Sequence, residues 1–137
     1  MEALGRLFNI VQHPQRVNLR DAGGVTVVCF GTADTFTLQE ANAASGGTSR
    51  DLDVIDHYYA TTTADGRWTL VAQTADAVVD PGASVLISVF EVEASWLSDG
   101  YDYISVTPSS TGECVYLLRD LHVQRKPTNL AAAGVGL

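Results

Sequence analysis

Few basic residues, few cysteines and no long apolar run occur in this sequence, and each shortage excludes a class of protein. Only eight of the 137 residues are Lys or Arg, against sixteen acids, so the formal net charge is −8. This balance argues against a direct nucleic-acid binder, because phosphate contacts need clustered basic side chains. The unbroken apolar runs are only a few residues long, too short to cross a bilayer as a helix. We therefore expect neither nucleic acid nor membrane as a direct partner.

Cysteine is almost absent, and no secretion signal is evident. The N-terminal residues 1–11 have an acid at position two and no apolar segment that ends in a small-residue cleavage site, so we predict no signal peptide. Cys29 and Cys114 lie 114 − 29 = 85 positions apart, each inside an apolar, strand-like run. We predict buried free thiols in a reducing compartment, since a disulfide would need Cα atoms within about 6 Å of each other.

What the sequence does have is strand signal. Apolar residues make up 46% of the chain and the mean hydropathy is +0.10, enough for one domain with a real core. Segments rich in β-branched, aromatic and alternating apolar residues occur at 25–30, 35–39, 54–62, 67–73, 84–93, 101–107 and 114–118. Turn signals at Asp65-Gly66 and Asp80-Pro81-Gly82 separate the three segments 54–62, 67–73 and 84–93. The pattern predicts an all-β fold, either an antiparallel β-sandwich or a small barrel of about eight strands.

Two strand segments have clear apolar patterns. Trp68, Leu70 and Ala72 alternate onto one face of segment 67–73, and segment 84–89 is apolar on both faces, as in a covered central strand. The predicted strands contribute most of the chain's aromatic residues: Tyr58, Tyr59, Trp68, Tyr101, Tyr103 and Tyr116, with Trp96 in a predicted turn. We interpret these aromatic residues as core or as oligomer interface, where Tyr and Trp are enriched.

Charge divides the chain into a body and two ends. We predict an extended N-terminal arm at 1–22, a β-sandwich body at 23–122 and a C-terminal arm at 123–137. Residues 21–118 hold two basic and fourteen acidic residues, so they carry 2 − 14 = −12, while each end carries 3 − 1 = +2. Basic, apolar-tipped arms on an acidic body suggest contacts with acidic neighbours, including other copies of the chain. The candidate partner-interface residues are Arg6, Leu7, Phe8, Ile10, Arg16, Arg125, Lys126, Pro127 and Leu130.

Catalytic patterns are missing, so we predict no enzyme, no cofactor and no metal. His13, His57 and His122 show no zinc-ligand spacing, and no nucleophile motif is present. The Ser45–Thr48 stretch lacks the Lys of a phosphate-binding loop and is interpreted as a plain glycine loop. Several acids cluster, namely Asp51, Asp53, Asp56, Glu91, Glu93, Asp99 and Asp102. A Ca²⁺ site or a glycosidase pair is the alternative to the favoured interpretation, a solvated strand face.

Five stretches of the sequence carry a resemblance, at residues 4–11, 37–47, 68–74, 90–106 and 115–130. They resemble small virion proteins of tailed bacteriophages, most of all those of phages that infect actinobacteria. The resemblance runs over most of the chain and implies a non-enzymatic structural protein of the phage head, either a capsid decoration (cement) protein or a minor capsid protein. It implies the major capsid protein or other virion proteins as partners, and a virion location after assembly in the host cytoplasm.

Closed symmetry is common among such proteins, so a homo-oligomer, dimer or trimer, is expected. Two alternatives stay open. One is a phage tail or head–tail connector protein, which would occur in far fewer copies per virion. The other is a carbohydrate- or host-surface-binding β-sandwich that uses Trp68, Trp96 and nearby tyrosines.

Overall fold

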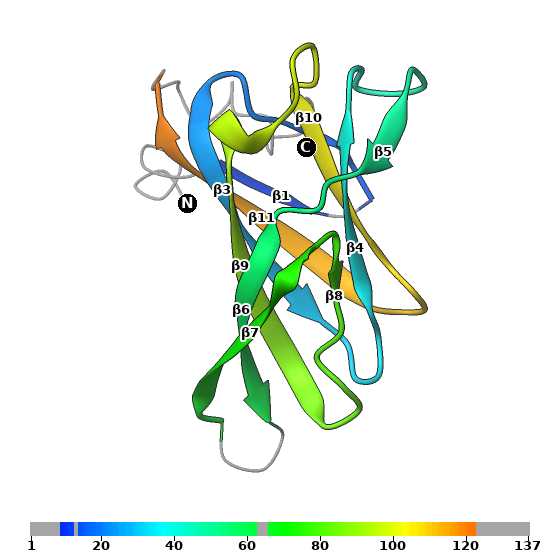
Figure 1. Ribbon diagram of the computed structural model, residues 1–137, viewed down its shortest axis with the longest axis vertical. Helices are drawn as coiled ribbons and strands as arrows, with labels where there is room; N and C mark the ends of the chain where they lie inside the picture. The colour runs from blue at the N-terminus through cyan, green and yellow to red at the C-terminus, as the bar shows by residue number, and fades with distance from the viewer. Residues whose placement is uncertain (1–8, 13, 63–65, 123–137) are drawn as a thin grey trace, which may run out of the picture.

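The protein is a sandwich of two antiparallel sheets (Figure 1). The computed structural model describes residues 9–12, 14–62 and 66–122. Its elements are β1 (Asn9–Gln12), β2 (Val17–Asn18), β3 (Ala22–Phe30), β4 (Phe36–Ala41), β5 (Ser49–Asp51), β6 (Ile55–Thr62), β7 (Trp68–Asp76), β8 (Val78–Val79), β9 (Val85–Glu93), the 3₁₀ turn η1 (Ala94–Trp96), β10 (Tyr103–Pro108) and β11 (Glu113–Leu121). One sheet has the order β1-β11-β3-β9-β6-β7, and the other has the order β2-β10-β4-β5 with β8 beside β4. Neither order closes on itself, so the predicted sandwich is confirmed and the barrel is not formed.

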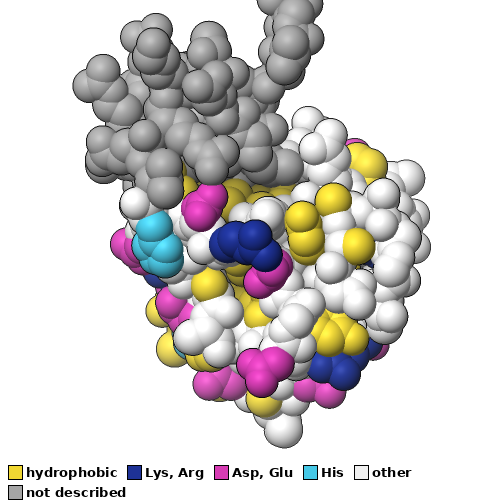
Figure 2. Space-filling view, turned by 90° about the horizontal axis from the view of Figure 1, so that it is seen from above, with side chains coloured by type: hydrophobic (Ala, Val, Ile, Leu, Met, Phe, Trp, Pro, Cys, Tyr) yellow, Lys and Arg dark blue, Asp and Glu magenta, His cyan; other side chains and the backbone are white. Residues whose placement is uncertain are grey.

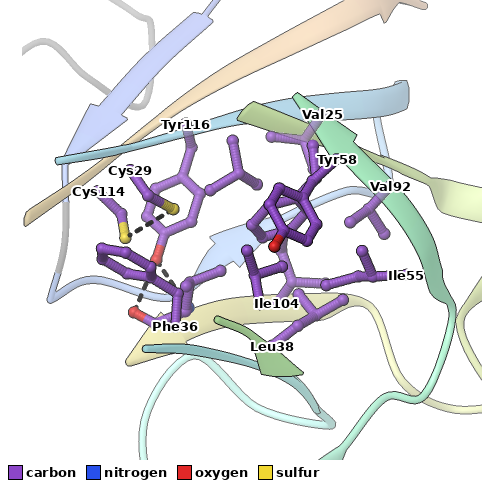
Figure 3. Close-up of a cluster of buried hydrophobic side chains, with 14 of the residues drawn as sticks. Val25, Cys29, Phe36, Leu38, Ile55, Tyr58, Val92, Ile104, Cys114 and Tyr116 are labelled. Atoms are coloured by element: carbon purple, nitrogen blue, oxygen red, sulfur yellow. Dashed lines mark hydrogen bonds between the residues drawn. The ribbon is translucent and has the colours of Figure 1, made fainter. Parts of the chain in front are cut away.

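Alternation along the strands builds the core between the sheets. In β3, Val25, Val27 and Cys29 are buried while the residues between them are half-exposed, and Phe36 and Leu38 do the same in β4. Because side chains point to opposite faces of a strand in turn, each strand contributes every second residue to the core. The result is one apolar cluster with contributions from both sheets (Figure 3).

The predicted turns lie where the sequence indicated. Gly82 has a φ of 87°, and its N–H lies 3.3 Å from Oδ1 of Asp80, so the Asp-Pro-Gly turn delivers the chain into β9. Strands β6 and β7 pair antiparallel on either side of the other predicted turn, Asp65-Gly66. Gly66 has the expected positive φ of 66°, whereas Asp65 lies outside the described residues.

The body begins earlier than the predicted boundary at residue 23. Strand β1 pairs with β11, and β2 pairs with β10, so the described part of residues 9–22 belongs to the two sheets. Val17 and Leu19 are each only 2% exposed. The pairing of β1 and β2 corrects the expected N-terminal arm for the described part of residues 9–22. Strand β1 has four residues and β2 has two, which is too short to give a period-two pattern in the sequence. Strand β11 ends at Leu121, and the predicted C-terminal arm, residues 123–137, lies outside the described residues.

A buried tyrosine links the sheets through the core. Tyr116 of β11 is fully buried, and its hydroxyl oxygen lies 2.8 Å from the backbone nitrogen of Val106 in β10 (Figure 3). Strand β2 pairs with β10 only at Tyr103 and Ile104, so the edge of β10 beyond them has no strand partner in the described residues. The phenol hydroxyl therefore accepts a backbone hydrogen bond that a longer β2 would otherwise take.

Candidate functional site: an exposed apolar surface

The six-stranded sheet leaves a group of large apolar side chains in solvent at its β7 edge. Tyr59 in β6 is 45% exposed, and Trp68 and Leu70 in β7 are 54% and 56% exposed. Val89 in β9 is half-buried beside them. We call these four residues the β6–β7 surface. Exposure of such side chains to water is unfavourable, because burial would lower the free energy of the protein. Contiguous exposed apolar groups on the surface of a domain therefore mark sites of interaction.

The strand register puts the four side chains on one face. Tyr59 pairs directly with Val89 on one side and with Leu70 on the other, and Trp68 precedes Leu70 by two residues. Directly paired residues of antiparallel strands point to the same face, as do residues two apart in one strand. The surface is therefore a continuous apolar row across three strands, on the face turned away from the core.

Two shallow hollows lie over this row. One, of about 300 Å³, is lined by Tyr59, Trp68 and Val89. The other, of about 220 Å³, is lined by Tyr59 and Val89 together with His57, Phe90 and Glu91. The His57 ring meets Tyr59 edge to face at 6.0 Å between ring centroids. His57 and Glu91 thus give the apolar row a polar rim on the side of the second hollow.

On the same sheet face, charged side chains near the ends of β9 and β11 pair with one another. The guanidinium of Arg119 contacts Glu93, reaches Glu91 at 3.5 Å and bonds Asp120 at 2.8 Å. Arg119 and Glu93 both lie opposite Gly24 of the intervening strand β3, where a Cβ would meet the guanidinium at 3.0 Å. Gly24 therefore leaves the room in which the arginine crosses the strand, and this charged group shares the sheet face with the apolar row.

Several of the acids that lie close together in the sequence have partners within the protein. Glu91 and Glu93 share Arg119, Asp102 bonds Arg20 at 3.1 Å, and Asp51 accepts from the Gln39 amide at 2.9 Å. At the end of the sandwich opposite the β6–β7 hairpin, basic side chains lie beside acidic ones (Figure 2). Within residues 9–12, 14–62 and 66–122, no three His, Cys, Asp or Glu side chains come together as a metal-binding group.

Two acids, Asp34 and Glu40, are buried, which the sequence did not indicate. Glu40 is 1% exposed and accepts from Arg50 Nε at 2.8 Å and from the Ser98 backbone nitrogen at 2.9 Å, while Arg50 stacks on the Tyr101 ring at 4.4 Å. Burial alone would raise the pKa of Glu40, but these hydrogen bonds and the arginine charge outweigh it and hold the pKa below its ordinary value. The network ties β4 and β5 to the segment after η1, so its role is structural.

The predicted interface residues fall partly inside the body. Arg16 donates from Nη1 to the carbonyl oxygens of Ala43 at 2.8 Å and Gly46 at 2.7 Å, which fixes the loop between β4 and β5. Ile10 lies in β1 opposite Leu117. The other seven candidates lie outside the described residues: Arg6, Leu7, Phe8, Arg125, Lys126, Pro127 and Leu130. A partner role for all nine stays a prediction.

The aromatic residues separate into core and surface. Tyr58 and Tyr116 are buried, and the Tyr58 hydroxyl donates to the Asp80 carbonyl at 3.0 Å. Trp96 is 44% exposed, but η1 follows the end of β9 that is remote from Trp68 (Figure 1). The two tryptophans that the sequence offered as one sugar platform therefore lie at opposite ends of the sheet.

The cysteines and histidines take structural positions. Cys29 and Cys114 are fully buried free thiols, directly paired across β3 and β11, with their sulfurs 3.4 Å apart (Figure 3). Burial and the neighbouring thiol raise the pKa of Cys29 far above its ordinary value, so it stays protonated. His57 is exposed beside Asp56 at 2.6 Å, and the backbone N–H of His122 bonds Asp21; His13 lies outside the described residues.

Comparisons with protein-family models, with curated proteins and with solved structures gave no match. Among the residues that the structure describes, no helix is long and apolar enough to cross a membrane.

The sequence showed the apolar residues of the β6–β7 surface, but the expectation for segment 84–89, which supplies Val89, differs from the structure. Segment 84–89 is apolar on both faces and was expected to be covered on both. In the structure β9 is central, between β3 and β6, yet Ile87 and Val89 on its outer face are only partly buried and Leu86 is 46% exposed. A strand that is apolar on both faces in a two-layer sandwich has one face left for a partner.

Proposed function

We propose that the protein is a non-enzymatic structural protein of a bacteriophage head, a capsid decoration (cement) or minor capsid protein that binds the shell lattice and its own copies. The observation that carries the proposal is the β6–β7 surface, an exposed apolar row on an otherwise acidic sandwich. Interfaces are built around aromatic and aliphatic side chains of this kind. The sequence resemblance to phage head proteins supplies the biological setting.

The architecture suits repeated weak contacts. Each copy offers a compact sandwich, and the predicted basic ends carry charge opposite to the acidic body of a neighbour. In a lattice, one contact raises the effective concentration for the next, so individually weak surfaces give firm attachment.

Sedimentation with assembled heads of a phage that encodes this chain tests the proposal. We expect the purified protein to pellet with the heads, and quantitative mass spectrometry to find hundreds of copies per virion. A dozen copies or fewer would instead favour the tail or head–tail connector alternative. Absence from the virion together with no binding to heads would refute a virion role.

Deletion of residues 125–137 tests the predicted C-terminal arm separately. Strand β11 ends at Leu121, so the truncated protein should keep the thermal midpoint of the full chain while binding heads more weakly. A matched control is Lys126→Gln with Arg125→Gln in the full chain, which removes the charge and keeps the length. Unfolding of the truncated protein would show that the segment belongs to the core.

Glycan binding is the second candidate function, and the hollow between Tyr59 and Trp68 favours it. Sugars stack on exposed aromatic faces and hydrogen-bond to polar groups nearby, and His57 and Glu91 border the adjoining hollow. A glycan array with the intact protein is the test. Binding that Trp68→Ala removes and Trp96→Ala leaves intact would support it, whereas an array without signal would exclude it.

A further inference from the structure

Strand β7 forms an open edge of the six-stranded sheet. It stands last in the order β1-β11-β3-β9-β6-β7, is nine residues long and is exposed over most of its length. On its outer side, no other strand of the described residues pairs with it. Half of its backbone N–H and C=O groups therefore face solvent in the arrangement that accepts a further strand.

The other edges of the two sheets carry protection that β7 lacks. Strands β2 and β8 are two residues long, β1 has four residues, and β5 has three with Arg50 and Asp51 among them. Short length and charge are the usual devices against edge pairing. Residues 68–75 contain neither a charged side chain nor a proline. The contrast within one molecule indicates that the β7 edge is available for pairing.

A bulge limits the pairing stretch to the first half of β7. Between the pairs Ile55–Asp76 and His57–Ala72, β7 has three intervening residues and β6 has one. Extra residues bend a strand and disrupt its ladder. The regular edge is therefore 68–72, with Leu70 at its centre.

We propose that two copies of the chain form a two-fold dimer in which the β7 edges pair antiparallel, with Leu70 of each copy opposite Leu70 of the other. The inference deepens the proposed function, since it names the surface through which copies associate. Identical edges meet under a two-fold axis, which is the closed symmetry found most often in homo-oligomers. The two six-stranded sheets then become one continuous sheet.

Side-chain sizes and charges favour this register. Trp68 of each copy comes opposite Ala72 of the other, so each indole lies over a small neighbour. The apolar row extends without a break as Val89, Tyr59 and Leu70 of one copy followed by the same three of the second in reverse order. Centring on Ala72 instead would set each Trp68 against Asp76. Copies that each carry −8 repel one another, and the uncharged stretch 68–75 is where they can approach.

The expected dimer is weak. A fully covered aromatic side chain buries about 150–250 Å², so the exposed parts of Tyr59, Trp68 and Leu70 offer roughly 300 Å² per copy. Stable complexes bury about 800 Å² per partner. We therefore expect a reversible dimer at micromolar or higher concentration, which a lattice of many contacts would stabilise further.

Sedimentation velocity of the full chain over a concentration series is the first test. We expect a shift from monomer to dimer with rising concentration, and Leu70→Lys should remove the dimer because it sets two like charges together at the axis. Thr74→Lys is the matched control, because it places the same charge on the same strand beyond the regular stretch 68–72 and should keep the dimer. Both residues are exposed, so both variants should keep the wild-type melting temperature. A wild-type chain that is monomeric throughout would overturn the inference.

Cysteine cross-linking tests the register independently. In the proposed dimer the two Leu70 positions face each other, while the two Ala72 positions are four residues apart along the ladder, about 13 Å at 3.3 Å per residue. A disulfide needs Cα atoms within about 7 Å. Under mild oxidation with glutathione disulfide, Leu70→Cys should cross-link at least tenfold faster than Ala72→Cys. The native thiols Cys29 and Cys114 are buried, and the unmodified chain serves as the blank. Equal rates for the two variants would overturn the pairing.

These tests separate the inference from the function it deepens. If the protein binds phage heads but stays monomeric and shows no preference for cross-linking at residue 70, the dimer is wrong and the head role stands. If the β7 dimer forms and no head binding or virion incorporation is found, the reverse holds.

Discussion

The hydroxyl of Tyr116 offers the sharpest test of how the two sheets are joined. Tyr116→Phe removes one oxygen and leaves the ring, the packing and the volume of the core almost unchanged. The backbone N–H of Val106, now 2.8 Å from that oxygen, then loses its acceptor in a residue that is fully buried. The carbonyl of Val106 loses only a long contact of 3.4 Å, so the N–H dominates the cost.

The expected destabilisation follows from that one unsatisfied donor. Removing one partner of a buried hydrogen bond costs about 1–3 kcal/mol. Each kcal/mol lowers the melting temperature by roughly 2–8 °C for domains of 60–250 residues, so a fall of several degrees is expected. Urea unfolding at neutral pH, followed by tryptophan fluorescence, measures the free energy of unfolding directly.

Tyr103→Phe is the matched control for this experiment. Tyr103 lies in β10 itself and is half-buried, and its hydroxyl makes no hydrogen bond to the other described residues. Its removal should change stability by less than about 0.5 kcal/mol. If Tyr116→Phe costs no more than this control, the Val106 N–H has another partner, and the hydroxyl does not join the sheets as we argue.

Three further predictions concern the buried Glu40, the two thiols and Gly24, which lies under Arg119. Glu40→Gln should lower stability at neutral pH by about 1–2 kcal/mol, since Arg50 is half-exposed and regains water. Because the pKa of Glu40 is lowered on folding, the wild type holds this stability above the unfolded pKa near 4.3 and loses it as pH falls through the folded pKa, so urea midpoints of wild type and variant should converge in acid. Both cysteines should resist maleimide in the folded protein and react fully in denaturant, as counted by mass spectrometry; rapid labelling at neutral pH would contradict their burial and the raised pKa of Cys29. Gly24→Ala should cost about 1–3 kcal/mol in thermal unfolding, because the new Cβ would lie 2.8 Å from the Val92 carbonyl oxygen, and an unchanged midpoint would show that Arg119 and β9 yield freely.

The fold class and the positions of seven strands followed from the sequence alone, namely β3, β4, β6, β7, β9, β10 and β11. Alternation at Phe36 and Leu38 is a local signal, as is the Asp-Pro-Gly turn before β9, and such signals need no knowledge of distant residues. The sequence also showed that segment 84–89 is apolar on both faces. It did not show whether another layer covers the outer face, because that depends on the tertiary arrangement of the strands.

The tertiary structure alone decided which strands are edges and which polar groups meet. The short strands β1 and β2 are defined by their pairing with the distant strands β11 and β10, so no local pattern marked residues 9–22 as part of the body. Glu40 is buried because Ser98, 58 positions away, supplies a hydrogen bond in the interior. Trp68 and Leu70 form an exposed surface because the sheet ends at β7, and that order is a property of the whole chain. The alternation of apolar and polar residues depends on residues close in the sequence. Sheet edges and hydrogen-bond partners depend instead on contacts between residues far apart in the chain.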